Sequence, residues 1–219
     1  MNINTIENRD ALEGLRDIES ASIDCIITDP PWPYNSYNQF PNRNLTYKTV
    51  TNEYLEETFK ELYRVLKKGK HAYVFTTNLR LGKDITTLEK CGFRYNQTLI
   101  LLANGIKLGY GYRHTYLPIL FLDKKGTSVT NLHDVSNVLG PSDFNVLSKP
   151  VEIIVTFLRQ STKEGDLILD PFMGSGSTAV ACKRIGRDYL GFEIDKERFE
   201  TANIRIEQTH VFADMEVEE

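Results

Sequence analysis

The stretch DLILDPFMGSGSTAVACKRIGRDYLGFEID (166–195) decides the fold. It starts with a short apolar run typical of a buried strand, passes through a glycine-rich turn and a helical pattern, and ends with a second apolar run. Gly174, Gly176 and Ala179 match the G-x-G-x-x-G/A pattern of a strand-to-helix turn whose backbone lies close to a ligand. Glu193 follows about 20 residues later, where an acid can accept hydrogen bonds from an adenosine ribose. The stretch therefore predicts a β-α-β unit that binds an adenosine-containing cofactor.

Asp170 separates two classes of such cofactors. It lies at the expected strand end immediately before the glycine turn, where its charge would repel a pyrophosphate. The same charge would attract the ammonium group of a methionine, and S-adenosylmethionine carries no phosphate. An NAD domain also places most of its sheet after this unit, whereas only residues 177–219 follow the turn here. The sequence therefore favours S-adenosylmethionine and predicts a circularly permuted order, in which most strands precede the cofactor unit.

Apolar runs and helical patterns alternate along the rest of the chain, as in α/β proteins. Seven strands are expected, at 2–6, 23–28, 72–77, 95–103, 116–123, 166–170 and 188–194. Six helices are expected, at 10–18, 53–67, 81–91, 150–160, 177–185 and 196–209. We therefore expect a single α/β domain over 1–219, with a mostly parallel seven-stranded sheet covered by helices on both faces.

The tetrapeptide Asp29-Pro30-Pro31-Trp32 directly follows the apolar run 23–28. The prolines end the strand and fix a rigid turn, because each has a fixed φ and no N–H. The Asp29 carboxylate and the Pro30 carbonyl can then point at one spot, and two acceptors suit the two N–H groups of an exocyclic amine. Trp32 adds an aromatic face for a base. The motif predicts an amino-group methylation site; a strand-ending turn with a partly buried tryptophan is the structural alternative.

Composition limits the classes of partner. The 219 residues are 41% hydrophobic and 26% charged, which is ordinary for a soluble globular protein. The net charge of −4 argues against a protein that coats nucleic acid through its overall field, so any such contact must be local. The chain has no apolar run long enough to span a bilayer and no signal-peptide pattern, which predicts a cytoplasmic protein without a membrane partner. Its cysteines, Cys25, Cys91 and Cys182, are typical of reduced core residues, and no metal site is expected.

Two segments together resemble the amino-methyltransferase family that modifies adenine N6 or cytosine N4 in DNA. NRDALEGLRDIESASIDCIITDPPW (8–32) resembles the family's opening, and SKPVEIIVTFLRQSTKEGDLILDPFMGSGSTAVACKRIGRDYLGFEID (148–195) resembles its cofactor half. The catalytic motif precedes the cofactor motif, as in the permuted class of this family. The resemblance covers nearly the whole chain and implies a Rossmann-like fold that binds S-adenosylmethionine.

The resemblance also implies roles for individual residues. Asp29 and Pro30 would hold the target amino group, while Pro31 and Trp32 would shape its pocket. The implied cofactor residues are Asp10, Lys149, Pro150, Asp170, Phe172, Gly174, Gly176 and Glu193. Asp10 would accept a hydrogen bond from the cofactor's adenine, which we favour, although Asp10-Ala-Leu-Glu13 is also a plausible helix capping box. Arg9 stands where the family usually has glycine.

The target base is less determined than the reaction. Trp32 occupies a position that is more often tyrosine, and tryptophan there resembles adenine enzymes more than cytosine enzymes. The resemblance thus implies methylation of adenine N6 in a flipped-out DNA base. Cytosine N4 in DNA stays an alternative, as does adenine in RNA, since 109–126 faintly resembles the mRNA adenine methyltransferases. The non-enzyme alternative is a silent nucleic-acid-binding subunit, against which the two intact motifs argue.

Contacts with nucleic acid are expected at a cluster of cations and aromatics that suits phosphates and bases. The cluster includes Lys107, Tyr112, Arg113 and His114, although a solvated loop would have a similar composition. Target recognition would fall to a pocket-flanking loop at about 35–50 and a small insertion at about 124–148, which is rich in turn-forming residues. Both are short for sequence recognition, which a homodimer or a DNA-recognition partner subunit would explain.

Overall fold

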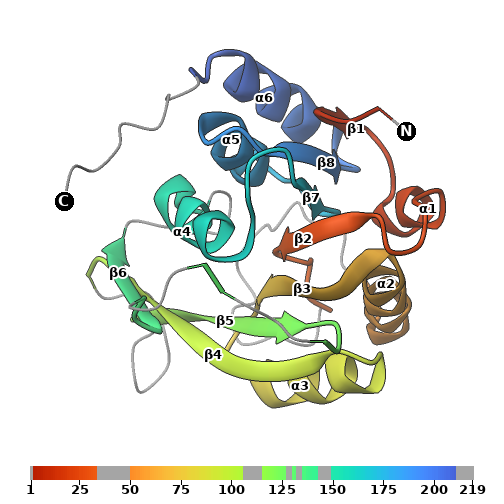
Figure 1. Cartoon of the computed structure of the whole chain (residues 1–219), viewed down its shortest axis with the longest axis vertical. Coiled ribbons are helices and arrows are strands. Elements are labelled where there is room, and N and C mark those ends of the chain that lie inside the picture. Colours follow the sequence, from red (N-terminus) through yellow and green to blue (C-terminus); the bar gives the residue numbers. More distant parts are fainter. Residues whose placement is uncertain are drawn as a thin grey trace, which may run out of the picture.

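The structure of the chain is a computed structural model that describes residues 2–33, 50–105, 115–126, 130–131, 135–142 and 149–210. The strands of these residues form one sheet in the order β1-β8-β7-β2-β3-β5-β4-β6 (Figure 1). Their bounds are β1 (Thr5–Glu7), β2 (Ile23–Thr28), β3 (Leu66–Phe75), β4 (Arg94–Ala103), β5 (Tyr116–Asp123), β6 (Val138–Ser142), β7 (Leu167–Asp170) and β8 (Asp188–Phe192).

Parallel pairing dominates this sheet. The neighbours β1, β8, β7, β2 and β3 all run in the same direction, and β4 pairs with β6 in parallel. Among the described strands, only β5 runs antiparallel to its neighbours. The expected α/β class and mostly parallel sheet are therefore confirmed. Because five adjacent strands are parallel, their carboxyl ends all lie at one edge of the sheet.

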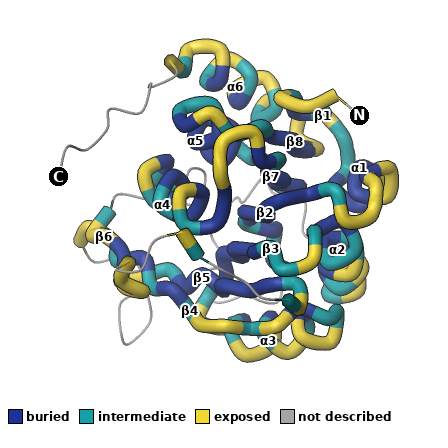
Figure 2. The backbone as a smooth tube through the Cα atoms, viewed as in Figure 1, coloured by how far each residue is buried: buried dark blue, intermediate teal, exposed yellow. Residues whose placement is uncertain are grey.

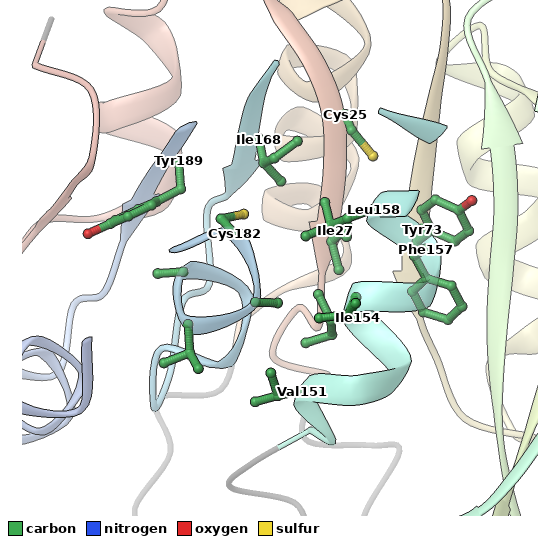
Figure 3. Packing of buried hydrophobic residues seen from close by; sticks show 14 of the residues in the cluster. Cys25, Ile27, Tyr73, Val151, Ile154, Phe157, Leu158, Ile168, Cys182 and Tyr189 are labelled. Carbon is green, nitrogen blue, oxygen red and sulfur yellow. The ribbon is translucent and has the colours of Figure 1, made fainter. Parts of the chain in front are cut away.

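Helices cover both faces of the sheet, as the sequence predicts (Figures 1 and 2). Their bounds are α1 (Ala11–Arg16), α2 (Asn52–Val65), α3 (Leu81–Lys90), α4 (Val151–Ser161), α5 (Ser177–Arg184) and α6 (Lys196–Glu207). Helices α1, α2 and α3 pack in one hydrophobic cluster, and α4, α5 and α6 pack in another. The two clusters share β2: Ile26 faces the first, whereas Cys25 and Ile27 face the second. Figure 3 shows the second cluster, where Ile154 and Leu158 of α4 lie beside Ile27.

The described residues form eight strands, one more than the seven that the sequence predicts. Strand β6 lies inside 124–148, which was expected to be an insertion with at most short structure. Its sequence, VLGPS, has no apolar alternation, so no local pattern indicates a strand. It forms by pairing with β4, where Ile100 aligns with Val138 and Leu101 with Leu139. The extra strand therefore forms because the edge of β4 is available for pairing.

The boundary between α2 and β3 also differs from the expectation. The helix ends at Val65, although it was expected to reach 67, and the strand starts at Leu66, before the expected 72. Leu66 aligns with Ile23 of β2. Lys67 binds the Asp24 carboxylate with a distance of 2.7 Å between the charged atoms. Strand pairing and this ion pair therefore override the helical pattern.

No helix in the described part of the chain is both long enough and apolar enough to cross a membrane.

Candidate active site at the carboxyl edge of the parallel strands

Three acidic residues follow one another along the carboxyl edge of the sheet. Glu193 comes directly after β8, Asp170 is the last residue of β7, and Asp29 comes directly after β2. These strands are neighbours in the order β8-β7-β2, and adjacent strands lie about 4.8 Å apart. In open α/β sheets this edge is where ligands bind. The fold therefore brings the predicted cofactor motif and the Asp-Pro-Pro-Trp motif together, although they lie far apart in the sequence.

The turn between β7 and α5 needs both of its glycines. Gly174 has φ +55° and Gly176 has φ +82°, in the left-handed region that side chains disfavour. A Cβ on Gly176 would lie 3.1 Å from the Ala202 Cβ of α6. Arg205 of α6 braces the turn by donating to the Ser175 carbonyl at 3.1 Å. The result is a braced turn at the end of β7, in which Gly174 is half-buried and Gly176 is buried.

Asp170 is a buried acid held at this turn. One carboxylate oxygen accepts the Phe172 N–H at 3.1 Å, and the other accepts the Thr178 hydroxyl at 2.7 Å. Burial, with a smaller contribution from the charge of Asp29, raises the pKa of Asp170 to about 7. No cationic side chain of the described residues forms an ion pair with it. The carboxylate therefore lacks a positive partner, and through Thr178 it is bound to the first turn of α5, near the helix N-terminus where a phosphate would otherwise bind.

Glu193 ties the glycine turn to the end of β8. One carboxylate oxygen accepts the Gly174 N–H and the other accepts the Asp195 N–H, both at 2.8 Å. An ionised carboxylate has about four acceptor positions, so these two bonds leave capacity for ligand hydroxyls. The residue is fixed in place and still able to bind.

Asp29 forms an ion pair with Lys149, which directly precedes Pro150, the N-cap residue of α4. The Lys149 side chain is 12% exposed, and its ammonium also lies 5.5 Å from the centre of the Phe75 ring. The sequence predicts a cofactor role for Lys149, whereas in the structure its ammonium group pairs with Asp29 of the Asp-Pro-Pro-Trp motif. Its link to Asp29 could not be predicted, because the two residues are 120 positions apart in the sequence.

Trp32 lies in the hydrophobic cluster of α1, α2 and α3 and is 6% exposed. The guanidinium of Arg80 lies over its ring, 5.2 Å from the centroid. The preceding Pro30 is also buried. The tetrapeptide thus forms a packed turn in which only Asp29 and Pro31 are half-exposed, and base stacking on Trp32 stays a prediction.

Asp10 is the N-cap of α1, as the capping alternative predicts. One oxygen accepts the N–H groups of Leu12 and Glu13, at 2.9 and 3.2 Å, and the other accepts the Tyr54 hydroxyl at 2.9 Å. The Arg9 N–H donates to the Glu193 carbonyl at 3.2 Å, so this cap lies beside the end of β8. A role for Asp10 toward a cofactor stays a prediction.

Several predicted contacts lie outside the described residues. Lys107, Tyr112, Arg113 and His114 belong to this group, with most of 35–50 and much of 124–148. Conversely, the structure adds Tyr54, which contacts Asp10, and Arg80, which contacts Trp32. It also adds Arg205, which contacts Ser175 between the two predicted glycines. None of the three belongs to a local motif, so only the tertiary structure reveals them.

Comparison with known proteins agrees with this geometry. The sequence model of the DNA methylase family matches residues 122–204. Type II methyltransferase M.HpaI of Haemophilus parainfluenzae is 30% identical over 230 aligned positions, which cover 90% of this chain and 72% of that protein. The chain belongs to the DNA methylase family. A second relative, the putative methylase YubD of Escherichia coli, is 31% identical over 79% of this chain and 77% of its own length.

Solved structures show that this DNA methylase has a fold found in other DNA methyltransferases. The M1.HpyAVI-SAM complex superimposes with a TM-score of 0.74 over 92% of this chain and 98% of that one, at 24% identity. The cytosine-N4-specific PvuII DNA methyltransferase gives a TM-score of 0.73 at 16% identity, over 98% of this chain and 88% of that one. At these identities the likeness concerns the fold alone.

Proposed function

We propose that the chain transfers a methyl group from S-adenosylmethionine to N6 of adenine in DNA. The observation that carries the proposal is the position of Asp29, one strand away from the unpaired acid Asp170, at the carboxyl edge of one parallel sheet. The choice of adenine is supported by Trp32 and by a relative, the DNA adenine methyltransferase YhdJ of Escherichia coli. YhdJ is 25% identical over 88% of this chain and 79% of its own length.

The residues of the β7 and β8 ends fit this cofactor. Asp170 would bind the methionine ammonium, which supplies the positive charge that its buried carboxylate lacks. Glu193 would accept hydrogen bonds from the ribose hydroxyls. The backbone of Gly174 leaves room for close approach, because a Cβ there would meet only the Phe172 carbonyl, at 3.9 Å. The remaining cofactor residues would be Asp10, Pro150, Phe172 and Gly176, whereas we assign Lys149, for which the sequence predicts a cofactor role, to Asp29, with which it forms an ion pair. When bound, S-adenosylmethionine supplies a methyl group on a positively charged sulfur.

The turn after β2 would bind the target. The Asp29 carboxylate and the Pro30 carbonyl would accept hydrogen bonds from the two N–H groups of the exocyclic amine. These two hydrogen bonds favour a pyramidal nitrogen with an available lone pair. The amine loses one proton on methylation, and the half-exposed Asp29 carboxylate would receive it. Pro31 and Trp32 would shape the pocket around the flipped base.

Neutralising Lys149 should slow methyl transfer more than it weakens cofactor binding. In a Lys149→Gln variant, Asp29 loses the charge that orients its carboxylate. We expect kcat to fall about 10- to 100-fold, the range for a hydrogen bond to a charged group, with the Kd for S-adenosylmethionine within about threefold of wild type. Calorimetry and single-turnover kinetics measure the two quantities. A large loss of affinity at normal kcat would instead assign Lys149 to the cofactor.

The reaction itself is tested with methyl-labelled S-adenosylmethionine and unmethylated genomic DNA, followed by mass spectrometry of the nucleosides. Labelled N6-methyladenine is the expected product. Labelled N4-methylcytosine would overturn the choice of base and leave the chemistry in place. Label on RNA but not on DNA would overturn the choice of polymer, and absence of cofactor binding by calorimetry would overturn the whole proposal.

DNA contact by Lys107, Tyr112, Arg113 and His114 is part of this proposal, as is recognition of the target by the loops at about 35–50 and 124–148. A homodimer or a separate recognition subunit would supplement these short loops. Exchanging 127–134 for a glycine-serine linker should alter the set of methylated sites, and an unchanged set would exclude this segment from recognition.

A further inference from the structure

Arg80 lies over the ring of Trp32 although it belongs to neither motif. It immediately precedes α3, in the connection that follows β3, while Trp32 follows β2. Strands β2 and β3 are parallel neighbours, with Thr28 aligned to Val74, so both connections leave the same edge of the sheet. The guanidinium carbon is 5.2 Å from the ring centroid, within the range of a cation–π contact. Both residues are more than nine-tenths buried.

The guanidinium is held in place from two other directions. One terminal nitrogen donates to the Asp84 carboxylate at 2.8 Å, and the second Asp84 oxygen accepts the Thr76 hydroxyl at 2.5 Å. The other terminal nitrogen donates to the Asn52 side chain at 3.3 Å. Arg80 thus contacts the two residues, Trp32 and Asn52, that flank 34–49 in the sequence. Its Nε has no hydrogen-bond partner in the described part of the chain.

Placing a buried ion pair in a hydrophobic cluster costs desolvation free energy. Desolvation of Arg80 and Asp84 offsets most of their attraction, and apolar side chains of similar size commonly stabilise a fold as well or better. Fold stability alone therefore does not account for an arginine at this position. A planar guanidinium can, however, hold a fixed hydrogen-bonding geometry and stack on an aromatic ring at the same time, which a lysine cannot.

We infer that Arg80 is a positioning residue for methyl transfer: anchored by Asp84, it clamps Trp32 and thereby fixes the turn that carries Asp29 and Pro30. The inference rests on the proposed function, since the clamp matters only if this turn holds the target amine. Two acceptors orient an amine only when the turn is rigid, and small displacements of reacting groups lower the rate strongly. Arg80 acts through Trp32 and touches no reacting atom.

Trp32 is the single tryptophan of the chain, so its fluorescence reports on the clamp without any enzymatic assay. We would compare the wild type with Arg80→Lys, which keeps the charge, and with the double variant Arg80→Met/Asp84→Asn, which removes both charges and keeps an acceptor for Thr76. Both variants should show altered emission and increased acrylamide quenching. Arg64→Lys is the matched control, because Arg64 braces α1 through the Leu15 carbonyl, away from Trp32.

The kinetic readout separates positioning from folding. In both Arg80 variants kcat should fall about 3- to 30-fold, the range of a cation–π contact, while the Kd for S-adenosylmethionine stays within about twofold. The control should keep wild-type kcat and fluorescence. Wild-type fluorescence and kcat in both Arg80 variants would overturn the inference, as would an equal loss of cofactor binding, which indicates general unfolding. Failure of the proposed function is distinguishable, because the wild type itself would then label no adenine in DNA.

Discussion

Replacing Asp29 with alanine should reduce methyl transfer by at least about 100-fold, because the residue provides both an acceptor for the target amine and a site for its proton. Asp29→Asn keeps one acceptor oxygen and a partner for Lys149, and so should retain more activity than alanine. Single-turnover transfer from labelled S-adenosylmethionine to DNA measures the rate, and calorimetry should show a cofactor affinity within about fivefold of wild type.

Asp24→Asn provides the matched control for this experiment. Asp24 lies near the other end of the same strand and is likewise paired with lysines, Lys67 and Lys70. Its variant should lose some thermal stability and keep a near-normal rate per folded molecule. Near-normal transfer in Asp29→Ala would remove Asp29 from the mechanism and with it the proposed target site.

Asp170→Asn should weaken cofactor binding and at the same time stabilise the ligand-free protein near pH 8. The pKa of Asp170 rises from 3.8 to about 7 in the folded chain, mainly through burial. A raised carboxyl pKa means that the folded state binds the proton more tightly than the unfolded state does. The contribution of Asp170 to the free energy of unfolding is therefore present at low pH and is lost as the pH rises from about 4 through about 7. The loss is at most about 4 kcal/mol.

The asparagine variant lacks this pH-dependent loss. Its amide can accept the Phe172 N–H and donate to the Thr178 hydroxyl, so both local bonds are retained. In thermal melts without ligand, the variant's advantage should be several degrees at pH 8 and clearly smaller at pH 5. Its Kd for S-adenosylmethionine should rise at least about tenfold, because the ammonium loses its charged partner.

Asp166→Asn is the control for Asp170. Asp166 directly precedes β7 and is paired with Lys70, so its removal should lower stability without weakening the cofactor. An equal melting difference at pH 5 and pH 8 would contradict the pKa argument. Unchanged cofactor affinity in Asp170→Asn would contradict the assignment of the ammonium to this residue. The two measurements are independent, because the melting temperature is measured without ligand and the affinity is measured with it.

The pairing of Asp29 with Lys149 bears on both experiments. Asp29 raises the pKa of Asp170 through its charge, so the two acids at the ends of β2 and β7 influence each other electrostatically. Lys149 offsets the Asp29 charge from the start of α4. The site therefore holds two neighbouring carboxylates, one with a protein cation and one that can take its cation from a ligand.

The sequence by itself determined the class of fold, the positions of most elements and the two motifs. These follow from short-range causes: apolar periodicity in 53–67 and 116–123, the positive φ that Gly174 and Gly176 adopt, and the fixed φ of Pro30 and Pro31. The capping of α1 by Asp10 could also be predicted from the sequence, because a cap involves residues only two or three positions apart.

Only the tertiary structure decided the contacts between distant segments. Strand β6 and the early start of β3 form through sheet pairing, which a local pattern cannot encode. The ion pair of Asp29 with Lys149 and the clamp of Arg80 on Trp32 join residues whose meeting depends on strand order. Periodicity and propensity act over a few residues, whereas the placement of a charge beside an acid or a ring is set by packing of the whole sheet.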